Sequence, residues 1–317
     1  FYVNVPFGIL FFIMGFKYLP KDKRISGQHI DAIGAVLSFA GTTLLFWALI
    51  QAQKVGFSNP YIMVTLLLSI IIITIFVKFE KGHTQPLLDI NLFKNRLFSI
   101  SLLCALISFI CISAYTLLFP FYFEDTLKLA PSYSGFLMMI PPIIIASLSA
   151  FCGNLADKIG AEILTMIGLS IMAVSFFLMS FLDLHSSLLS CAIFLAVMAV
   201  GQAFFQPANN SLIMSACPKD KLGIGGSVNS WVRNLGQYAG VVLSTTFLFL
   251  FMSNQVGYAV SDYVQGQDAV FVYGMKSDFI ILMSLCVLGV LITAYRYMQT
   301  REKVIATYQY VQTREKN

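Results

Sequence analysis

The stretch from Phe98 to Tyr122 reads FSISLLCALISFICISAYTLLFPFY and contains no charged residue. A helix needs about 20 mainly apolar residues to cross a hydrocarbon layer of about 30 Å, and this stretch is long enough. The rest of the chain has the same character, because 58% of its 317 residues are hydrophobic, 11% are charged and the mean hydropathy is +0.80. The sequence therefore predicts an all-α integral membrane protein.

Nine stretches of this kind are predicted to span the membrane. Each is an apolar run that ends at charged residues or at loop composition, and the runs lie roughly at 5–19, 31–52, 60–79, 98–122, 133–153, 160–182, 186–206, 225–252 and 277–298. Basic loops stay on the cytoplasmic side of a membrane. Alternate loops hold 17 and 3 of the 20 basic residues, a split that one missing helix would destroy. The same rule predicts a cytoplasmic C-terminus.

Residues that bind metals or nucleic acids are few and scattered. The six cysteines form no C-x-x-C pair and the three histidines lack ligand spacing. We therefore expect the cysteines to be packing residues and the protein to bind no metal. The net charge of +5 comes from the basic loops and suits an anionic lipid surface, so it does not argue for nucleic acid.

The loop after the fifth span reads GNLADKIG, from Gly153 to Gly160. Its two glycines favour a tight turn, and Asp157 is expected to accept hydrogen bonds from the start of the next helix. The loop, with Lys158 in its basic position, resembles the signature G-x-L-A-D-[RK]-x-G of the major facilitator superfamily. Ala161 and Glu162 replace the basic pair that usually follows, which is typical of the degraded second copy of this loop.

Further stretches resemble the fourteen-helix drug:proton antiporter branch of that family. FYVNVPFG at the start is similar to the entry of its sixth helix, DAIG at 31–34 to its first extra central helix, QPANNS at 206–211 to the end of its twelfth, and the segment 226–241 to the start of its thirteenth. The resemblance implies a major-facilitator-type helix bundle, with this chain holding nine of fourteen helices and lacking the first five. A start without Met agrees with that expectation.

The resemblance also implies a division into four parts. They are the last helix of the N-terminal bundle (1–24), two linking helices and a cytoplasmic linker (25–97), a C-terminal six-helix bundle (98–298) and a cytoplasmic tail (299–317). It implies export of lipophilic drugs or other toxic compounds across a bacterial cytoplasmic membrane, driven by a proton gradient and without a cofactor. The implied partners are the lipid bilayer, hydrophobic small molecules, protons and the missing N-terminal helices.

Two polar stripes are candidates for the substrate pathway, since polar stripes in lipid face the bundle interior or a water-filled cavity. The first comprises Gln202, Gln206, Asn209 and Asn210, and the second Ser227, Ser230, Asn234, Gln237 and Ser244. Tyr115 and Tyr238 add aromatic faces. For any single member, a hydrogen bond that joins two helices is an equally good explanation.

Five residues are candidates for structural hinges. They are Pro141 and Pro142 in the fifth predicted span, Pro207 at the end of the seventh, and Gly236 and Gly240 in the eighth. Proline removes a backbone hydrogen bond and bends a helix. The two glycines form a G-x-x-x-G step, for which close helix packing is the favoured interpretation.

Charged residues inside the predicted spans are few. Arg233 is the only basic residue well inside one, and it is either an interface anchor or half of an ion pair. No carboxylate is predicted in the middle of a span, because Asp31, Asp157 and Asp278 all fall at predicted helix ends. Proton coupling needs a buried carboxylate with a shifted pKa. We therefore expect the proton site in the helices that this chain lacks.

Two other interpretations stay open. In the first, the chain is a transport-inactive fragment. In the second, it is a membrane-embedded, lipid-linked transferase. The transferase would need an acidic metal cluster, or a nucleophile with a base, near one interface. The sequence shows neither, so a transporter is the preferred prediction.

Overall fold

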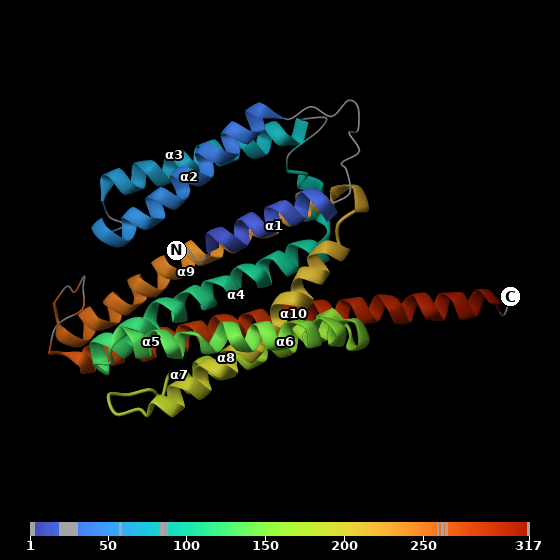
Figure 1. Ribbon diagram of the computed structural model, residues 1–317. Coiled ribbons are helices and arrows are strands. Elements are labelled where there is room, and N and C mark those ends of the chain that lie inside the picture. The colour runs from blue at the N-terminus through green and yellow to red at the C-terminus, as the bar shows by residue number, and fades with distance from the viewer. Residues whose placement is uncertain are drawn as a thin grey trace.

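The computed structural model describes residues 4–18, 31–56, 59–82, 86, 88–258, 260, 263 and 266–315, and this part of the chain contains helices and no strand. The junction at 24–25 between the first two expected parts, the first three residues and the last two lie outside it. The helices are α1 (Asn4–Tyr18), α2 (Ala32–Val55), α3 (Pro60–Gly82), η1 (Ile90–Lys94), α4 (Arg96–Phe121), η2 (Tyr122–Thr126), α5 (Pro131–Met138), α6 (Ile140–Ile159), α7 (Ala161–Met179), α8 (Leu188–Ser215), η3 (Lys219–Lys221), α9 (Leu222–Val256) and α10 (Asp268–Glu315) (Figure 1).

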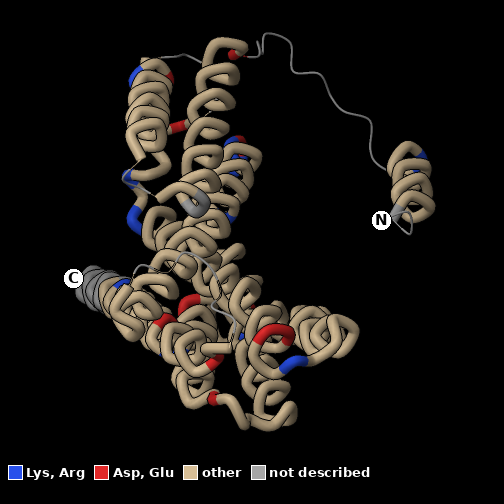
Figure 2. Tube along the Cα trace, turned by 90° about the vertical axis from the view of Figure 1, so that its left-hand side faces the viewer, with Lys and Arg blue, Asp and Glu red and all other residues tan. Residues whose placement is uncertain are grey.

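Eight of the described segments are long and apolar enough to cross a membrane. They are Ala32–Ala52, Pro60–Gly82, Arg96–Thr126, Pro131–Ile159, Ala161–Met179, Leu188–Ser215, Lys219–Val256 and Asp268–Gln299. The α1 helix is apolar but shorter, and Figure 2 shows it apart from the other helices. The prediction of an all-helical membrane protein is confirmed, whereas the count of nine spans out of fourteen stays a prediction.

The core lies between α4, α7, α8, α9 and α10. Its largest hydrophobic cluster includes the rings of Phe119 and Phe176, whose centroids each lie 6.0 Å from that of Phe279. The α7 and α8 backbones approach closely at two glycines, because a Cβ on Gly168 would lie 2.8 Å from the carbonyl oxygen of Gly201. The α2 and α3 helices form a hairpin beside this bundle (Figure 1).

The loop with the signature sequence differs from the expected two-glycine turn. Gly153 lies inside α6, and only Gly160 turns the chain, with a φ of 96° that favours glycine. The Gly160 N–H donates to the Ala156 carbonyl at 3.0 Å and closes the helix. Asp157 is exposed in the last turn of α6, and no side chain caps α7. The expected capping role of Asp157 is therefore wrong.

Two of the candidate prolines lie at the start of a helix and one lies inside a helix. The fifth predicted span is divided at Met139 into α5 and α6, and Pro141 and Pro142 lie at the start of α6, where a missing N–H leaves no intrahelical bond unmade. Pro207 lies inside α8, which continues to Ser215 beyond the predicted end at 206. Whether these prolines act as hinges stays a prediction.

The last span begins much earlier than its hydropathy suggested. The α10 helix starts at Asp268 rather than at 277, because the charged residues Asp268 and Lys276 interrupt an apolar run but not its helical backbone hydrogen bonds. Asp278 is consequently inside the helix and fully buried. The expectation that Asp278 lies at a helix end, and that no acid lies inside a span, is therefore wrong.

Candidate functional site

A buried polar cluster joins α4 to α8. Gln202 and Gln206 are one helical turn apart on α8 and share a face. Gln202 Nε2 donates to the Tyr115 hydroxyl of α4 at 2.9 Å, and Gln206 Nε2 donates to Gln202 Oε1 at 3.5 Å. Gln202 is 2% exposed, whereas Gln206 is partly accessible. We call these three residues the Gln202 cluster.

The rest of the first polar stripe also contacts neighbouring helices. Asn209 is buried, and its Nδ2 donates to the Ser101 carbonyl of α4 at 3.0 Å. Asn210 is exposed, and its Oδ1 accepts from Asn229 Nδ2 of α9 at 2.9 Å. These bonds tie α8 to both neighbours, so a packing role and a lining role coexist along one helix face.

The second polar stripe lies open along α9. Four of its members are exposed, and we call them the α9 polar face: Ser227, Ser230, Asn234 and Gln237. Exposed amide and hydroxyl groups on a spanning helix are unfavourable against hydrocarbon, so this face is suited to an aqueous cavity or a facing bundle. Ser244, seven residues beyond Gln237 on the same face, is instead buried.

Two further candidate residues flank the α9 polar face. The Tyr238 ring packs on the Phe46 ring of α2, with centroids 4.6 Å apart. Arg233 is exposed, and no ion pair to it is found within the described residues. It brings one positive charge to the edge of this face.

The glycine step of α9 serves close packing in this structure. A Cβ on Gly240 would lie 2.4 Å from the Ile110 carbonyl oxygen of α4, and a Cβ on Gly236 would lie 2.8 Å from Phe109 Cβ. A methyl group on either glycine would therefore overlap atoms of α4. The interpretation as a packing step therefore has direct structural support, and a hinge at these glycines stays a prediction.

One polar site was not anticipated from the sequence. Arg296 of α10 is 4% exposed, and its guanidinium donates to Ser101 Oγ at 2.9 Å and to Thr165 Oγ1 at 3.0 Å. Glu162 lies 3.9 Å from Arg296 Nε. Glu162 replaces a basic residue of the signature loop, and this substitution was the signal that an opposite charge lies nearby.

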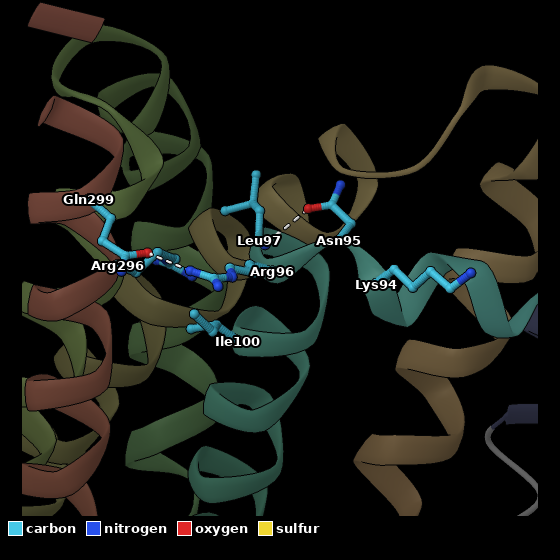
Figure 3. A pocket seen from close by; sticks show the side chains of 7 residues that line it. All are labelled: Lys94, Asn95, Arg96, Leu97, Ile100, Arg296 and Gln299. Atoms are coloured by element: carbon cyan, nitrogen blue, oxygen red, sulfur yellow. Dashed lines mark hydrogen bonds between the residues drawn. The ribbon is translucent and has the colours of Figure 1, made fainter. Parts of the chain in front are cut away.

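A shallow pocket of about 430 Å³ opens beside this site, between the start of α4 and α10. It is lined by Lys94, Asn95, Arg96, Leu97, Ile100, Arg296 and Gln299. Figure 3 shows Arg96 reaching toward Gln299, with which it forms a hydrogen bond of 3.4 Å, while Lys94 points away. The pocket is basic, but most of its charge belongs to surface side chains.

An ion pair between segments distant in sequence lies at each end of the bundle. Lys221 Nζ lies 2.5 Å from Asp89 Oδ2 and joins the linker to the start of α9, and Lys128 Nζ lies 3.6 Å from Asp268 Oδ1 at the other end. The Lys221 hydrogen bond holds the pKa of Asp89 below its usual value. At the other end, Tyr263 donates to Asp268 and to the Asp125 carbonyl, and burial raises the pKa of the Tyr263 hydroxyl. In the described residues, no group of three His, Cys, Asp or Glu side chains is placed to hold a metal ion.

A bundle of apolar helices with polar groups between them and a polar face on one helix is consistent with a membrane transporter. The chain belongs to the Major Facilitator Superfamily, which matches residues 1–241 and, in an overlapping second match, 102–307. This family consists of transporters, so the preference for a transporter over an enzyme is confirmed.

Similar proteins of known name support the same class. The chain is 29% identical over 307 residues to the riboflavin transporter RibZ of Clostridioides difficile, which covers 96% of this chain and 64% of that protein. It is 22% identical over 299 residues to the lincomycin resistance protein LmrB of Listeria monocytogenes, covering 93% and 63%. It is 22% identical over 253 residues to the multidrug resistance protein Stp of Mycobacterium tuberculosis, covering 80% and 47%. The chain thus spans less than two thirds of the length of these relatives.

Proposed function

We propose that this chain is part of a proton-coupled secondary transporter that exports lipophilic compounds across a bacterial cytoplasmic membrane. The observation that carries the proposal is the α9 polar face. Ser227 donates to the Gly223 carbonyl of its own helix at 3.0 Å, but the exposed amides of Asn234 and Gln237 on a spanning helix need water or a polar partner. The names of two relatives, a lincomycin resistance protein and a multidrug resistance protein, support export of toxic compounds.

The chemistry of the pathway favours uncharged or amphipathic compounds. Amides and hydroxyls of the α9 polar face offer both donors and acceptors, and Gln206 adds another amide at the edge of the Gln202 cluster. Tyr238 offers an aromatic face beside them. Such a surface orients a compound by a few hydrogen bonds and leaves its apolar parts to contact the bundle, as many small-molecule sites do.

Riboflavin transport is the second candidate function. It is favoured by the similarity to RibZ over 96% of this chain. Riboflavin has a flat aromatic ring system with several hydrogen-bonding groups, so the same amides and rings suit it. The two candidates share one pathway and differ in the compound carried.

A transport assay separates these candidates. The chain is expressed in a pump-deficient strain to test ethidium efflux with and without a protonophore, and in a riboflavin auxotroph to test growth on external riboflavin. Efflux that the protonophore abolishes supports the drug exporter, whereas growth of the auxotroph supports riboflavin transport. If protein present in the membrane gives neither activity across a broad compound panel, the transport-inactive fragment is the correct interpretation.

A matched pair of variants tests the pathway itself. Gln237→Leu removes one neutral hydrogen-bonding group from the α9 polar face, worth about 0.5–1.5 kcal/mol, and should reduce the apparent affinity for substrate about two- to tenfold. Gln255→Leu makes the same change at the exposed end of α9 and should leave transport unchanged. Equal effects of the two variants would remove the α9 polar face from the pathway.

A further inference from the structure

A carboxyl group is buried inside the bundle on the helix that ends the described chain. Asp278 lies ten residues after the start of α10, about 15 Å along the helix axis. It is fully buried, although it belongs to a residue type that is rarely buried without a partner. It forms no part of the Gln202 cluster or of the α9 polar face.

The hydrogen bonding of Asp278 is incomplete. Ser244 of α9 donates its hydroxyl to Oδ2, and Oδ1 is buried with no hydrogen-bond partner in the described residues. The Cys111 thiol of α4 lies within electrostatic range of the carboxyl, and it in turn lies 3.5 Å from the Cys286 sulfur. The immediate contacts of Asp278 are therefore neutral groups.

No positive charge compensates an ionised Asp278 from the elements packed against α10. On α9 the only charged residue is Arg233, which is eleven residues from Ser244, roughly 16 Å along the helix. The acids of η2, Glu124 and Asp125, would add negative charge only. The other ionisable groups lie elsewhere: Tyr115 bonds to Gln202, Tyr122 to the Asp183 carbonyl, and Glu162 lies beside Arg296. Arg96 of α4 bonds to Gln299, which is 21 residues from Asp278 and roughly 31 Å along α10. Lys276 is two residues from Asp278 on α10, so the two do not share a helix face.

The physical consequence is that the carboxyl is neutral in this conformation. An ionised carboxylate that is removed from water and has one neutral hydrogen bond costs several kcal/mol, and such a group binds a proton instead. Acids inside a membrane bundle are rare for this reason and commonly mark ion or proton pathways. Water must reach Asp278 before it can lose the proton.

We propose that Asp278 and Ser244 form a proton-binding site of the transport cycle. The carboxyl holds its proton while α9 and α10 are packed as in this structure, and releases it to water when the two helices separate. That this exchange drives transport rests on the proposed function, whereas the presence of the bound proton does not. From the sequence we expected the proton site in helices that this chain lacks, and the proposal assigns it to Asp278 instead.

The position of Ser244 connects this site to the pathway. Ser244 and Gln237 are seven residues apart, so they lie on one face of α9 about 10 Å from each other. Gln237 is exposed and Ser244 is covered by α10. A movement of α9 that responds to a compound at Gln237 therefore also changes the contact that shields Asp278.

Infrared spectroscopy tests the bound proton without any transport. The 317-residue chain is reconstituted in lipid nanodiscs and titrated with pH, and the carbonyl stretch of protonated carboxylic acids is compared between variants. Asp31 and Glu80 are also buried, so we expect a band at neutral pH with one component that disappears in Asp278→Asn and persists in Asp220→Asn, which changes an exposed acid. Ser244→Ala should keep the band and shift its frequency, because one hydrogen bond is lost.

The outcomes decide each part separately. An Asp278→Asn spectrum equal to that of the unchanged chain at every pH overturns the proton site, and an unshifted band in Ser244→Ala overturns the pairing even if Asp278→Asn fails to fold. In proteoliposomes, Asp278→Asn should lose proton-driven transport while exchanging substrate down its gradient. If driven transport persists, the coupling role is wrong. If the unchanged chain carries nothing but shows the band, only the proposed function fails.

Discussion

Replacing Gly240 with alanine tests the closest helix contact in the bundle. The added Cβ would lie 2.4 Å from the Ile110 carbonyl oxygen and 2.8 Å from Ile110 Cα, where ordinary contacts begin at 3.4 Å. The obstacle is backbone, so no side chain can rotate away. The α4 and α9 helices must move apart by roughly 1 Å, and overpacking of this kind costs about 1–3 kcal/mol. Separation by this distance also weakens the neighbouring van der Waals contacts.

The assay is reversible unfolding in mixed detergent micelles, followed by Trp fluorescence. Gly240→Ala should lower the free energy of unfolding by about 1–3 kcal/mol. The matched control is Gly223→Ala on the same helix, where a Cβ meets nothing within 4 Å and alanine is the better helix former. If Gly240→Ala is as stable as the control, α9 does not pack on α4 as described.

Two further predictions concern the polar contacts at the ends of the bundle. Asp89→Asn should reduce the free energy of unfolding at neutral pH by about 0.2–1 kcal/mol. Lys221 lowers the pKa of Asp89 in the folded protein below the ordinary 3.8. The difference should therefore disappear as the pH falls below 3.8 and through the pKa of the folded protein. A difference that persists in acid would show that the charge of Asp89 is not the cause. Arg296→Lys keeps the positive charge but lacks the planar guanidinium that donates to both Ser101 and Thr165. Thermal unfolding should show a loss of about 1–3 kcal/mol in the free energy of unfolding. An unchanged unfolding midpoint would contradict this geometry.

The spanning helices could be predicted well because their cause is local. Each apolar run satisfies its own backbone hydrogen bonds, so a run such as 98–122 becomes a helix whatever its neighbours are. The ends were harder to predict, because hydropathy follows side chains whereas a helix ends where its backbone bonds end. The start of α10 at Asp268 shows this, and it changed Asp278 from a helix-end residue into a buried one.

The sequence predicted which polar residues of the candidate site share a helix face, but not which residues on other helices they contact. Helical periodicity correctly grouped Gln202 with Gln206, and Ser227 with Gln237, on common faces. It could not tell that Gln202 bonds to Tyr115 or that the α9 polar face is open, because spacing within one helix contains no information about the helix that packs against it. The same limit hid the contacts of Arg296 with Ser101 and Thr165.

The sequence by itself determined the membrane class, the helical segments and the turn at Gly160, because lipid forces each segment to form its backbone hydrogen bonds internally and a positive φ favours glycine. Only the tertiary structure decided which polar side chains meet. Ser244 and Asp278 lie on different helices, as do Ser101 and Arg296. Their pairing depends on how closely helices approach at positions such as Gly240, which is a property of the packed bundle rather than of any one segment.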